Sequence, residues 1–210
     1  MTQAILFDFW GTLVENGVYS PVRQVRNVLR LQIPFQDYIV AFEESFMMKK
    51  HETLAAAFTD VCTTFGVRPE PMLIDRLIGL WNKNTLLAKP FPETEDVLND
   101  LKSEFKLALV SNTDPFSINQ VLDKFNLRPM FDTVAFSYEV GALKNDPKLF
   151  AAALKQLKMK PEDVLMIGDS LESDIKGAEN AGIPAILLDR RNVREFENKI
   201  QNLRDLRARL

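Results

Sequence analysis

The architecture of this chain follows from one segment, Ala4-Ile5-Leu6-Phe7-Asp8-Phe9-Trp10-Gly11-Thr12-Leu13-Val14. Its first six residues lack polar alternation and are too few for a buried helix, so they predict a central parallel strand covered on both faces. Asp8 lies near the carboxyl end of that strand, which is the end where open α/β sheets bind ligands. Gly11 gives the following turn backbone freedom, and the Thr12 hydroxyl can hydrogen-bond locally to hold the turn.

The composition limits the class of protein. With 210 residues, 46% of them hydrophobic, the chain can bury one core, or one core and a small accessory domain. The formal net charge of −3 at pH 7 gives no broad basic surface for nucleic acid or an anionic membrane, so we expect neither as a partner. Cys62 is the only cysteine and cannot form an intrachain disulfide, which fits a reducing compartment. No segment resembles a signal peptide or a membrane span, and we expect a cytoplasmic protein. The oligomeric state does not follow from the sequence.

Residues 16–89 are helical in pattern rather than strand-like. Ser20-Pro21 is typical of a helix start, and Pro69 and Pro71 open another helix. Two further helices carry apolar residues at helical spacing between these points, over residues 35–46 and 54–65. The pattern predicts a small antiparallel bundle inserted into a second unit. We therefore expect a core of residues 1–15 and 90–210 and a helical domain of residues 16–89.

From Pro90 onward the pattern alternates helix and strand. Such alternation predicts right-handed crossovers and a parallel sheet with helices on both faces, an α/β fold. The tail from Asn192 to Leu210 predicts a charged surface helix. The expected strands cover residues 107–110, 133–136, 164–167 and 185–188, and the expected helices cover residues 93–105, 115–125, 147–157 and 173–181.

Polar residues follow the predicted strands at the points where the strands end. If the strands are adjacent and parallel, these residues share one edge of the sheet. Two of the carboxylates, Asp8 and Asp169, are hard oxygen ligands suited to Mg²⁺. A hydroxyl and an ammonium group could then hold phosphoryl oxygens. The residues are Asp8, Ser111, Asn112, Lys144, Asp169 and Asp174.

Each of these residues also has an ordinary structural interpretation. Ser111 and Asn112 can end a strand and cap the next helix, and Lys144 can be a solvated lysine. Asp174 can stabilise the first turn of a helix through the helix dipole. Their occurrence together at successive strand ends favours a shared site for a metal ion and a phosphoryl group.

Four motifs together resemble the haloacid dehalogenase superfamily of hydrolases. The segment Phe7-Asp8-Phe9-Trp10-Gly11-Thr12-Leu13 resembles its nucleophile motif, and Val110-Ser111-Asn112 resembles its second motif. Lys144, after Glu139-Val140-Gly141, is similar to the third motif, and Gly168-Asp169-Ser170-Leu171-Glu172-Ser173-Asp174 is similar to the acidic fourth. The resemblance covers nearly the whole chain. It implies a Rossmann-like core, an inserted helical cap, and attack by the motif aspartate on phosphorus or carbon to form a covalent intermediate.

The resemblance also implies roles for individual residues. In the phosphatase branch of the family, Mg²⁺ would be bound by the Asp8 side chain, the Trp10 backbone carbonyl and Asp169, with Asp174 close by. The substrate would be a small phosphorylated molecule. The catalytic residues implied are Asp8, Thr12, Ser111 and Lys144, and the substrate-binding residues are Trp10, Gly11, Ser111, Asn112 and Lys144.

Trp10 departs from the phosphatase pattern. The family's phosphatases carry a second aspartate at this position as general acid and base, and an indole cannot exchange a proton with a leaving group at neutral pH. The 2-haloacid dehalogenases place a tyrosine there, but they use no metal and lack the Gly-Asp that begins the fourth motif. This chain keeps Asp169. Because neighbouring carboxylates raise one another's pKa without a cation, the sequence favours a metal-dependent phosphatase.

Two alternatives stay open: a 2-haloacid dehalogenase that uses Asp8 as nucleophile, and a weakly active or non-catalytic protein that binds a phosphorylated metabolite. The missing acid predicts that acyl and aryl phosphates are hydrolysed better than sugar phosphates. Lys49-Lys50-His51 is the only basic cluster of the helical segment that could face the site. His51, the sole histidine, could bind an anionic substrate or replace the missing acid, although a solvated helix end is the more frequent situation.

Overall fold

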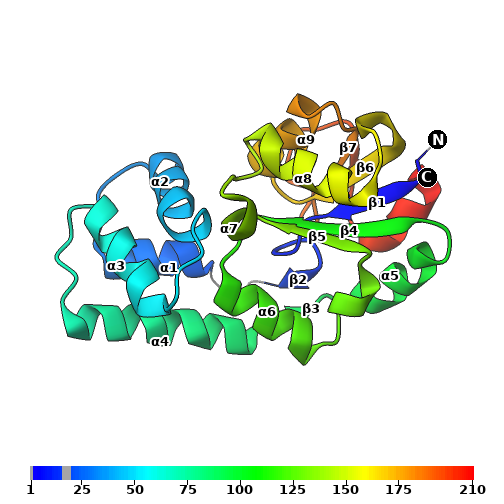
Figure 1. Ribbon diagram of the computed structural model, residues 1–210. Coiled ribbons are helices and arrows are strands. Elements are labelled where there is room, and N and C mark those ends of the chain that lie inside the picture. The colour runs from blue at the N-terminus through cyan, green and yellow to red at the C-terminus, as the bar shows by residue number, and fades with distance from the viewer. Residues whose placement is uncertain (1, 16–19) are drawn as a thin grey trace.

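A parallel sheet flanked by helices forms one lobe of the molecule, and a group of four helices forms the other (Figure 1). The computed structural model describes residues 2–15 and 20–210. The described parts of both chain ends lie in the sheet lobe, on the side away from the four helices (Figure 1). No helix among the described residues is both long and apolar enough to cross a membrane.

The sheet has six strands, and β1 (Ala4–Phe7) lies inside it between β4 (Lys106–Ser111) and β6 (Val164–Gly168). All the pairings in this sheet are parallel, and Phe7 is in register with Leu109 and Ile167. The carboxyl ends of β4, β1 and β6 therefore lie side by side, as the sequence predicts. The full order is β5 (Thr133–Phe136), β4, β1, β6, β7 (Ala185–Leu188) and β8 (Lys199–Ile200).

Each strand buries side chains on both faces of the sheet. In β1, Ile5 and Phe7 join one apolar cluster while Ala4 and Leu6 join another. On one face of the sheet the first cluster is covered by α5 (Thr94–Lys102) and α6 (Pro115–Lys124). On the other face the second cluster is covered by α8 (Pro147–Leu157) and α9 (Lys176–Asn180) (Figure 1). Because strands of this kind contact helices on both sides, their sequences are continuous apolar runs. The expected α/β fold is confirmed.

The four helices of the second lobe share an apolar cluster of their own. Thr53 begins α3 (Leu54–Thr64) by accepting a hydrogen bond from the Ala56 amide at 3.1 Å, as a good N-cap residue does. The cluster is rich in aromatic rings, and Trp81 packs against Phe46 with ring centroids 4.7 Å apart. These helices are α1 (Pro21–Val28), α2 (Phe35–Met47), α3 (Leu54–Thr64) and α4 (Pro71–Leu87).

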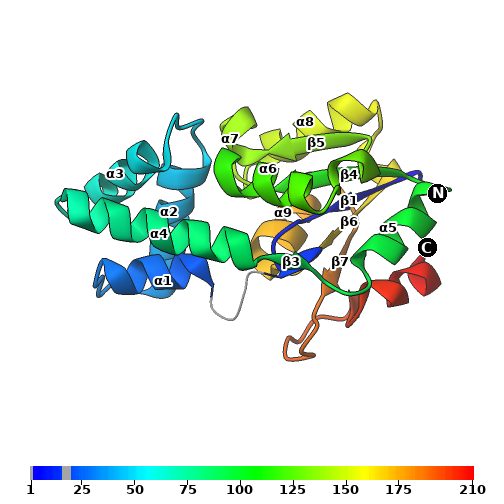
Figure 2. The same cartoon turned by 90° about the horizontal axis from the view of Figure 1, so that it is seen from below.

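A short antiparallel hairpin joins the lobes where the chain leaves and re-enters the sheet lobe. It pairs β2 (Val14–Glu15) with β3 (Lys89–Pro90). Figure 2 shows α4 running from the helical lobe directly to β3. The chain therefore enters and leaves the helical lobe next to the turn that follows Asp8.

The carboxyl-terminal tail differs from its prediction as one charged surface helix. Lys199–Ile200 adds β8 to the sheet edge, where the Asp189 amide donates to the Ile200 carbonyl at 2.8 Å. Residues Leu203–Arg209 then form a 3-10 helix that buries Leu203 and Leu206 against the sheet. The apolar residues of the tail are too few for a recognisable helical stripe, and Leu203 and Leu206 are buried in the apolar cluster that also includes residues of α5.

Shorter elements also refine the prediction. The expected helix over residues 173–181 is a π-helical turn, Leu171–Ile175, followed by α9. A short helix, α7 (Ser137–Val140), follows β5. Two further 3-10 turns cover Arg128–Met130 and Pro161–Asp163.

Candidate active site

Asp8 stands at the end of the central strand, held by the sheet and by the turn that follows. Its backbone amide donates to the Ile167 carbonyl at 2.9 Å, which continues the strand pairing by one residue. The Thr12 hydroxyl donates to Asp8 Oδ2 at 3.0 Å. Gly11 has a φ of +85°, a left-handed conformation that glycine adopts without strain. The turn thus directs a buried carboxylate away from the sheet and fixes one of its oxygens.

Lys144 lies buried between two carboxylates. Its Nζ donates to Asp8 Oδ1 and, at 2.6 Å, to Asp174 Oδ1. Its backbone amide donates to Asn112 Oδ1 at 2.9 Å, which fixes the loop that carries it. A buried ammonium group is stable only when it is paired and hydrogen-bonded, and both conditions hold here.

Two acids of the β6 loop complete the carboxylate group. Asp174 Oδ2 accepts from the Ser170 amide at 2.9 Å. The Asp169 carboxylate lies against Gly11, in the turn after Asp8, and a Cβ added to Gly11 would lie 2.5 Å from Asp169 Oδ2. One oxygen each of Asp8, Asp169 and Asp174 lies within 4.8 Å of the others. Glycine at position 11 is therefore needed for space as well as for backbone conformation.

The charges of this group do not balance. Burial raises the pKa of Asp8, Lys144 lowers it, and the negative charge of Asp174 raises it again. Burial and the charges of Asp8 and Asp174 also raise the pKa of Asp169, and the positive charges of Arg194 and Lys144 offset only part of this rise. The same two acids hold the pKa of Lys144 above its usual range, so the ammonium stays charged. Three carboxylates thus face one ammonium, and hard oxygen ligands with excess negative charge fit a divalent cation such as Mg²⁺.

These residues line one end of a cavity of about 220 Å³ between the two lobes. Of the residues predicted for the site, Asp8, Trp10, Asn112, Lys144, Asp169 and Asp174 contribute to its lining. Gly11, Thr12 and Ser111 do not contribute to it. Thr12 and Ser111 are fully buried, and Ser111 Oγ lies 3.5 Å from the Asn112 carbonyl oxygen.

Trp10 forms part of the cavity wall and is fixed on two sides. Its Nε1 donates to Thr113 Oγ1 at 3.1 Å, and its ring meets Phe9 edge to face with centroids 4.8 Å apart. Indole N–H is a donor only, and this donor is already engaged. The structure therefore agrees with the expectation that Trp10 cannot serve as a general acid and base.

Sequence reasoning missed Glu43 on α2 and Asp114 at the start of α6. Glu43 Oε2 accepts from Asn112 Nδ2 at 3.0 Å, and both acids line the cavity. Asp114 caps α6 and accepts from Trp81 Nε1 at 3.3 Å, across the two lobes. The Asp-Pro pair marked Asp114 as a helix start. Nothing in the sequence distinguishes Glu43 from Asp37 and Glu44, the other acids of α2.

The basic cluster after α2 does not line the cavity. Lys49 pairs with Asp60 at 2.9 Å on the surface of the helical lobe. His51 Nε2 lies 3.1 Å from the Ser45 carbonyl oxygen. Neither residue nor Lys50 contributes to the cavity lining.

Comparison with known proteins agrees with this geometry. The family model for haloacid dehalogenase-like hydrolases matches residues 2–182. A glyceraldehyde 3-phosphate phosphatase of Methanothermobacter thermautotrophicus is 29% identical over 195 residues, which cover 90% of this chain and 86% of that protein.

Solved structures with this fold include both phosphatases and dehalogenases. A HAD phosphatase from Thermococcus onnurineus superposes with a TM-score of 0.66 and 24% identity, over 99% of this chain and 97% of that one. A 2-haloacid dehalogenase from Pseudomonas syringae superposes with a TM-score of 0.67 and 20% identity, over 99% and 97% of the two chains. The fold is therefore common to two chemistries.

Proposed function

This chain belongs to the haloacid dehalogenase-like hydrolase family, and from that premise we propose that it is a Mg²⁺-dependent phosphatase of small phosphorylated compounds. The observation that carries the proposal is the charge imbalance at the strand ends, where three clustered carboxylates share one buried ammonium. A metal-independent reaction has no need for Asp169 beside Asp8. In a phosphoryl-transfer site, a cation beside the nucleophile stabilises the charge of the transferred group.

In this proposal Asp8 is the nucleophile. One oxygen of Asp8 attacks phosphorus as the bond from phosphorus to the leaving oxygen breaks, which gives an aspartyl phosphate, and water then hydrolyses that intermediate to free Asp8 and phosphate. Thr12, which donates to Asp8 Oδ2, holds the orientation of the carboxylate. Lys144 stabilises the negative phosphoryl oxygens, supported by Ser111 as the family resemblance implies, and Gly11 and Asn112 shape the phosphate end of the site.

Mg²⁺ would be held by Asp8, Asp169 and the Trp10 backbone carbonyl, with Asp174 in support, and would act as a Lewis acid on the phosphoryl group. Asp174 also keeps Lys144 in place, since its Oδ1 accepts from Nζ at 2.6 Å. Asp174 therefore has two tasks in this proposal, one toward the cation and one toward the ammonium.

The helical lobe acts as a cap, with residues 16–89 as a domain inserted into a core of residues 1–15 and 90–210. The separate apolar cluster of α1–α4 and the hairpin at the two chain crossings support this division. A cap over the site would exclude water from the reacting phosphoryl group.

The proposed substrate is a small phosphorylated molecule, such as a phosphate monoester or an acyl phosphate. The cavity of about 220 Å³ and the similarity to a glyceraldehyde 3-phosphate phosphatase support this class. We place the reaction in the cytoplasm, because the sole cysteine is buried and unpaired. Nucleic acid does not fit the proposal, because the charged side chains that face the cavity are mainly acidic.

A 2-haloacid dehalogenase is the second candidate, favoured by the aromatic Trp10 in the cavity wall. Phosphate release from a panel of phosphate esters, with Mg²⁺ or with EDTA, tests the first candidate. Chloride release from 2-chloropropionate under both conditions tests the second. Phosphate release that EDTA abolishes supports our proposal, and halide release that persists in EDTA would overturn it in favour of the dehalogenase.

A further inference from the structure

We propose that Glu43, on helix α2 of the helical lobe, is the general acid and base of this enzyme and takes the part that Trp10 cannot play. The inference rests on the proposed phosphatase function and assigns the proton transfers of that reaction. It places one catalytic group of the site on the helical lobe instead of the strand end.

The position of Glu43 on α2 points it at the cavity. Ile39, Glu43 and Met47 are spaced four residues apart, so they form one row on the helix surface, and all three line the cavity. The buried Phe42 and Phe46 beside this row pack into the apolar cluster of the helical lobe. Among the described residues that line the cavity from the helical lobe, Glu43 is the one that carries a charge.

Glu43 is tied to the core by the residue that also positions Lys144. Asn112 Nδ2 donates to Glu43 Oε2 at 3.0 Å, while Asn112 Oδ1 accepts from the Lys144 amide at 2.9 Å. One amide side chain therefore spans the helical lobe and the loop of the catalytic lysine. Within the described part of the chain, Asn112 is the hydrogen-bond partner of Glu43, and Oε1 remains available to a ligand.

The end of α2 is docked on the core as well. Ser137 Oγ donates to the Met47 carbonyl at 2.7 Å and accepts from the Thr113 amide at 2.9 Å. Leu143, next to Lys144, is buried in the apolar cluster of the helical lobe. These contacts hold the helix that carries Glu43 over the carboxyl ends of β4 and β5.

The surroundings of Glu43 suit a group that both donates and accepts a proton near neutral pH. The pKa of Glu43 is raised to about 7: burial raises it most, Asn112 and Lys144 lower it, and the carboxylates Asp174 and Asp8 raise it. These charged groups face it from the core, while Ile39 and Met47 flank it on its own helix. A general acid is most effective when its pKa lies near the working pH.

The direction of the reaction agrees with this placement. In an in-line displacement the leaving oxygen departs opposite Asp8, and Glu43 approaches the cavity from the other lobe. Asp8 Oδ bonds to phosphorus, the bond from phosphorus to the leaving oxygen breaks, and that oxygen takes the proton of Glu43 to leave as an alcohol. The Glu43 carboxylate then removes a proton from the water that attacks the aspartyl phosphate. Phosphate is released, and both Asp8 and protonated Glu43 are restored.

The inference changes an expectation drawn from the sequence. Without an acid, alkyl phosphates should react far more slowly than aryl phosphates, because an alkoxide is a poor leaving group. With Glu43 as donor, the native enzyme should hydrolyse both classes, and the logarithm of kcat/KM should depend only weakly on the pKa of the leaving alcohol.

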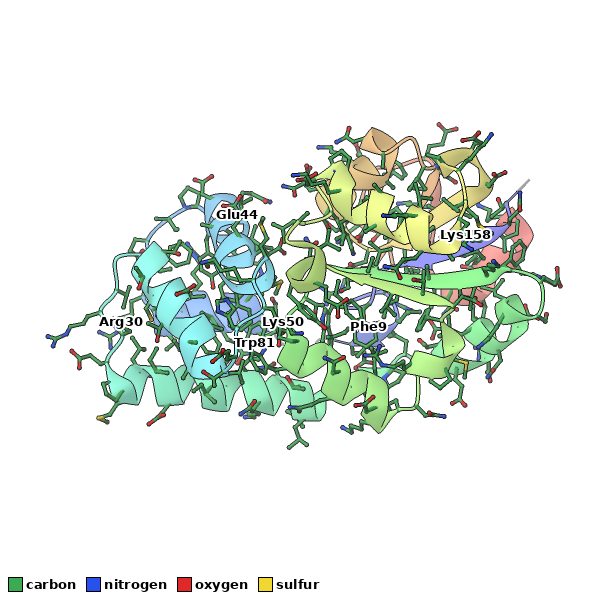
Figure 3. The ribbon with its side chains drawn as sticks, viewed as in Figure 1. Phe9, Arg30, Glu44, Lys50, Trp81 and Lys158 are labelled. Atoms are coloured by element: carbon green, nitrogen blue, oxygen red, sulfur yellow. The ribbon has the colours of Figure 1, made fainter. Side chains whose placement is uncertain are left out.

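The experiment compares Glu43→Gln with the native protein on glycerol phosphate and on p-nitrophenyl phosphate, with Mg²⁺ present. Glutamine keeps an oxygen that can accept from Asn112 but cannot donate as an acid. We expect kcat/KM for the alkyl ester to fall about 10²–10⁴-fold and kcat/KM for the aryl ester to change only a few-fold. Glu44→Gln is the matched control, because Glu44 is the exposed neighbour on the same helix (Figure 3). The control should leave both rates unchanged.

The pH profile gives a second readout. For the alkyl ester, native kcat/KM should fall as the pH rises through the pKa of Glu43, and this limb should vanish in Glu43→Gln. Equal losses for both esters, or a native rate that depends steeply on the leaving group, would overturn the role of Glu43 while leaving the phosphatase proposal in place. The native measurement decides even if the variant does not fold. Failure of the native protein to release phosphate from any ester would overturn the proposed function itself.

Discussion

The two sides of the cavity differ in kind. The core side presents Asp8, Lys144, Asp169 and Asp174 beyond the ends of parallel strands, and buried hydrogen bonds fix Asp8, Lys144 and Asp174. The helical side mixes apolar residues with uncharged polar ones, and Glu43 is its charged residue among those described. Strand ends are rigid and converge, so they suit a group of charges that must meet one phosphoryl group. A helix surface offers one row of side chains, which suits contact with the rest of the substrate.

This difference indicates a division of labour. The core side would bind and transfer the phosphoryl group for any substrate of this class. The helical side would decide which leaving group is accepted and would protonate it through Glu43. Substitutions on the core side should therefore remove activity with every substrate, and substitutions on the helical side should change the order of substrates.

Asp8→Asn should have the largest effect and is the strongest test of the core side. The amide cannot act as a nucleophile, so phosphate release should fall below detection for alkyl and aryl esters alike. Circular dichroism should show that the fold is kept, because asparagine fills nearly the same space. Asp96→Asn, at an exposed position on α5, is the control and should keep native rates. Residual turnover at the native level, once deamidation is excluded by mass spectrometry, would show that Asp8 is not the nucleophile.

Asp169→Asn tests whether the excess negative charge of the core side binds Mg²⁺, through the pH dependence of the protein's stability. Burial and neighbouring acids raise the pKa of Asp169, so the metal-free protein should lose stability as the pH rises above the ordinary carboxyl range. Mg²⁺ binds the ionised form and should restore that stability. At 100 times the Kd the gain is about 2.7 kcal/mol, or roughly 5–10 °C in Tm for a chain of this size.

The measurement is the change in Tm on adding MgCl₂ at pH 6 and at pH 8.5. In the native protein the rise in Tm should be larger at pH 8.5 than at pH 6. In Asp169→Asn the rise in Tm should be small at both pH values. Glu172→Gln is the control, since Glu172 pairs with Lys176 at 2.8 Å on the exposed face of the same loop. An equal rise in native and Asp169→Asn proteins would place the cation elsewhere.

Most of the core side could be predicted from the sequence, because a strand end followed by Gly or Asp is a local signal. Asp8, Lys144, Asp169 and Asp174 follow from apolar runs and the residues after them, and the parallel sheet brings them together. Glu43 could not be found in this way, because its placement depends on how α2 docks on the core through Ser137 and Asn112. Such contacts join residues about 70 to 90 positions apart.

The strand in the carboxyl-terminal tail is a second feature that could not be predicted from the sequence. Lys199–Ile200 is a two-residue strand, and nothing in so short a segment separates a strand from a loop. It forms because the edge of β7 offers unpaired backbone groups. Local propensity is a weak guide where tertiary contacts supply the hydrogen bonds.

Arg190→Met should have an intermediate effect and tests what we call the junction, the contact of the core segments next to the two points where the chain enters and leaves the helical lobe. The guanidinium donates to the Thr12 carbonyl at 2.8 Å, pairs with buried Glu93 at 2.6 Å and lies over the Phe91 ring at 3.5 Å. Loss of these partners leaves a buried carboxylate unpaired, so the free energy of unfolding should fall by about 1–3 kcal/mol. Chemical denaturation measures it, with exposed Arg191→Met as the control. A loss equal to that of the control would show that the junction does not depend on Arg190.

His51→Gln should have the smallest effect and tests the helical side against the simplest alternative donor. His51 Nε2 lies 3.1 Å from the Ser45 carbonyl oxygen, and its ring centroid is 6.4 Å from that of Phe46, within the helical lobe. Glutamine can donate to the same carbonyl, so the free energy of unfolding should change by less than about 1 kcal/mol. kcat/KM for glycerol phosphate and for p-nitrophenyl phosphate should stay within about twofold of native, since general acid catalysis is worth at least about 10²-fold where it operates. A selective loss with glycerol phosphate would instead make His51 the proton donor, and it would require α2 to move so that the imidazole replaces Glu43 at the cavity.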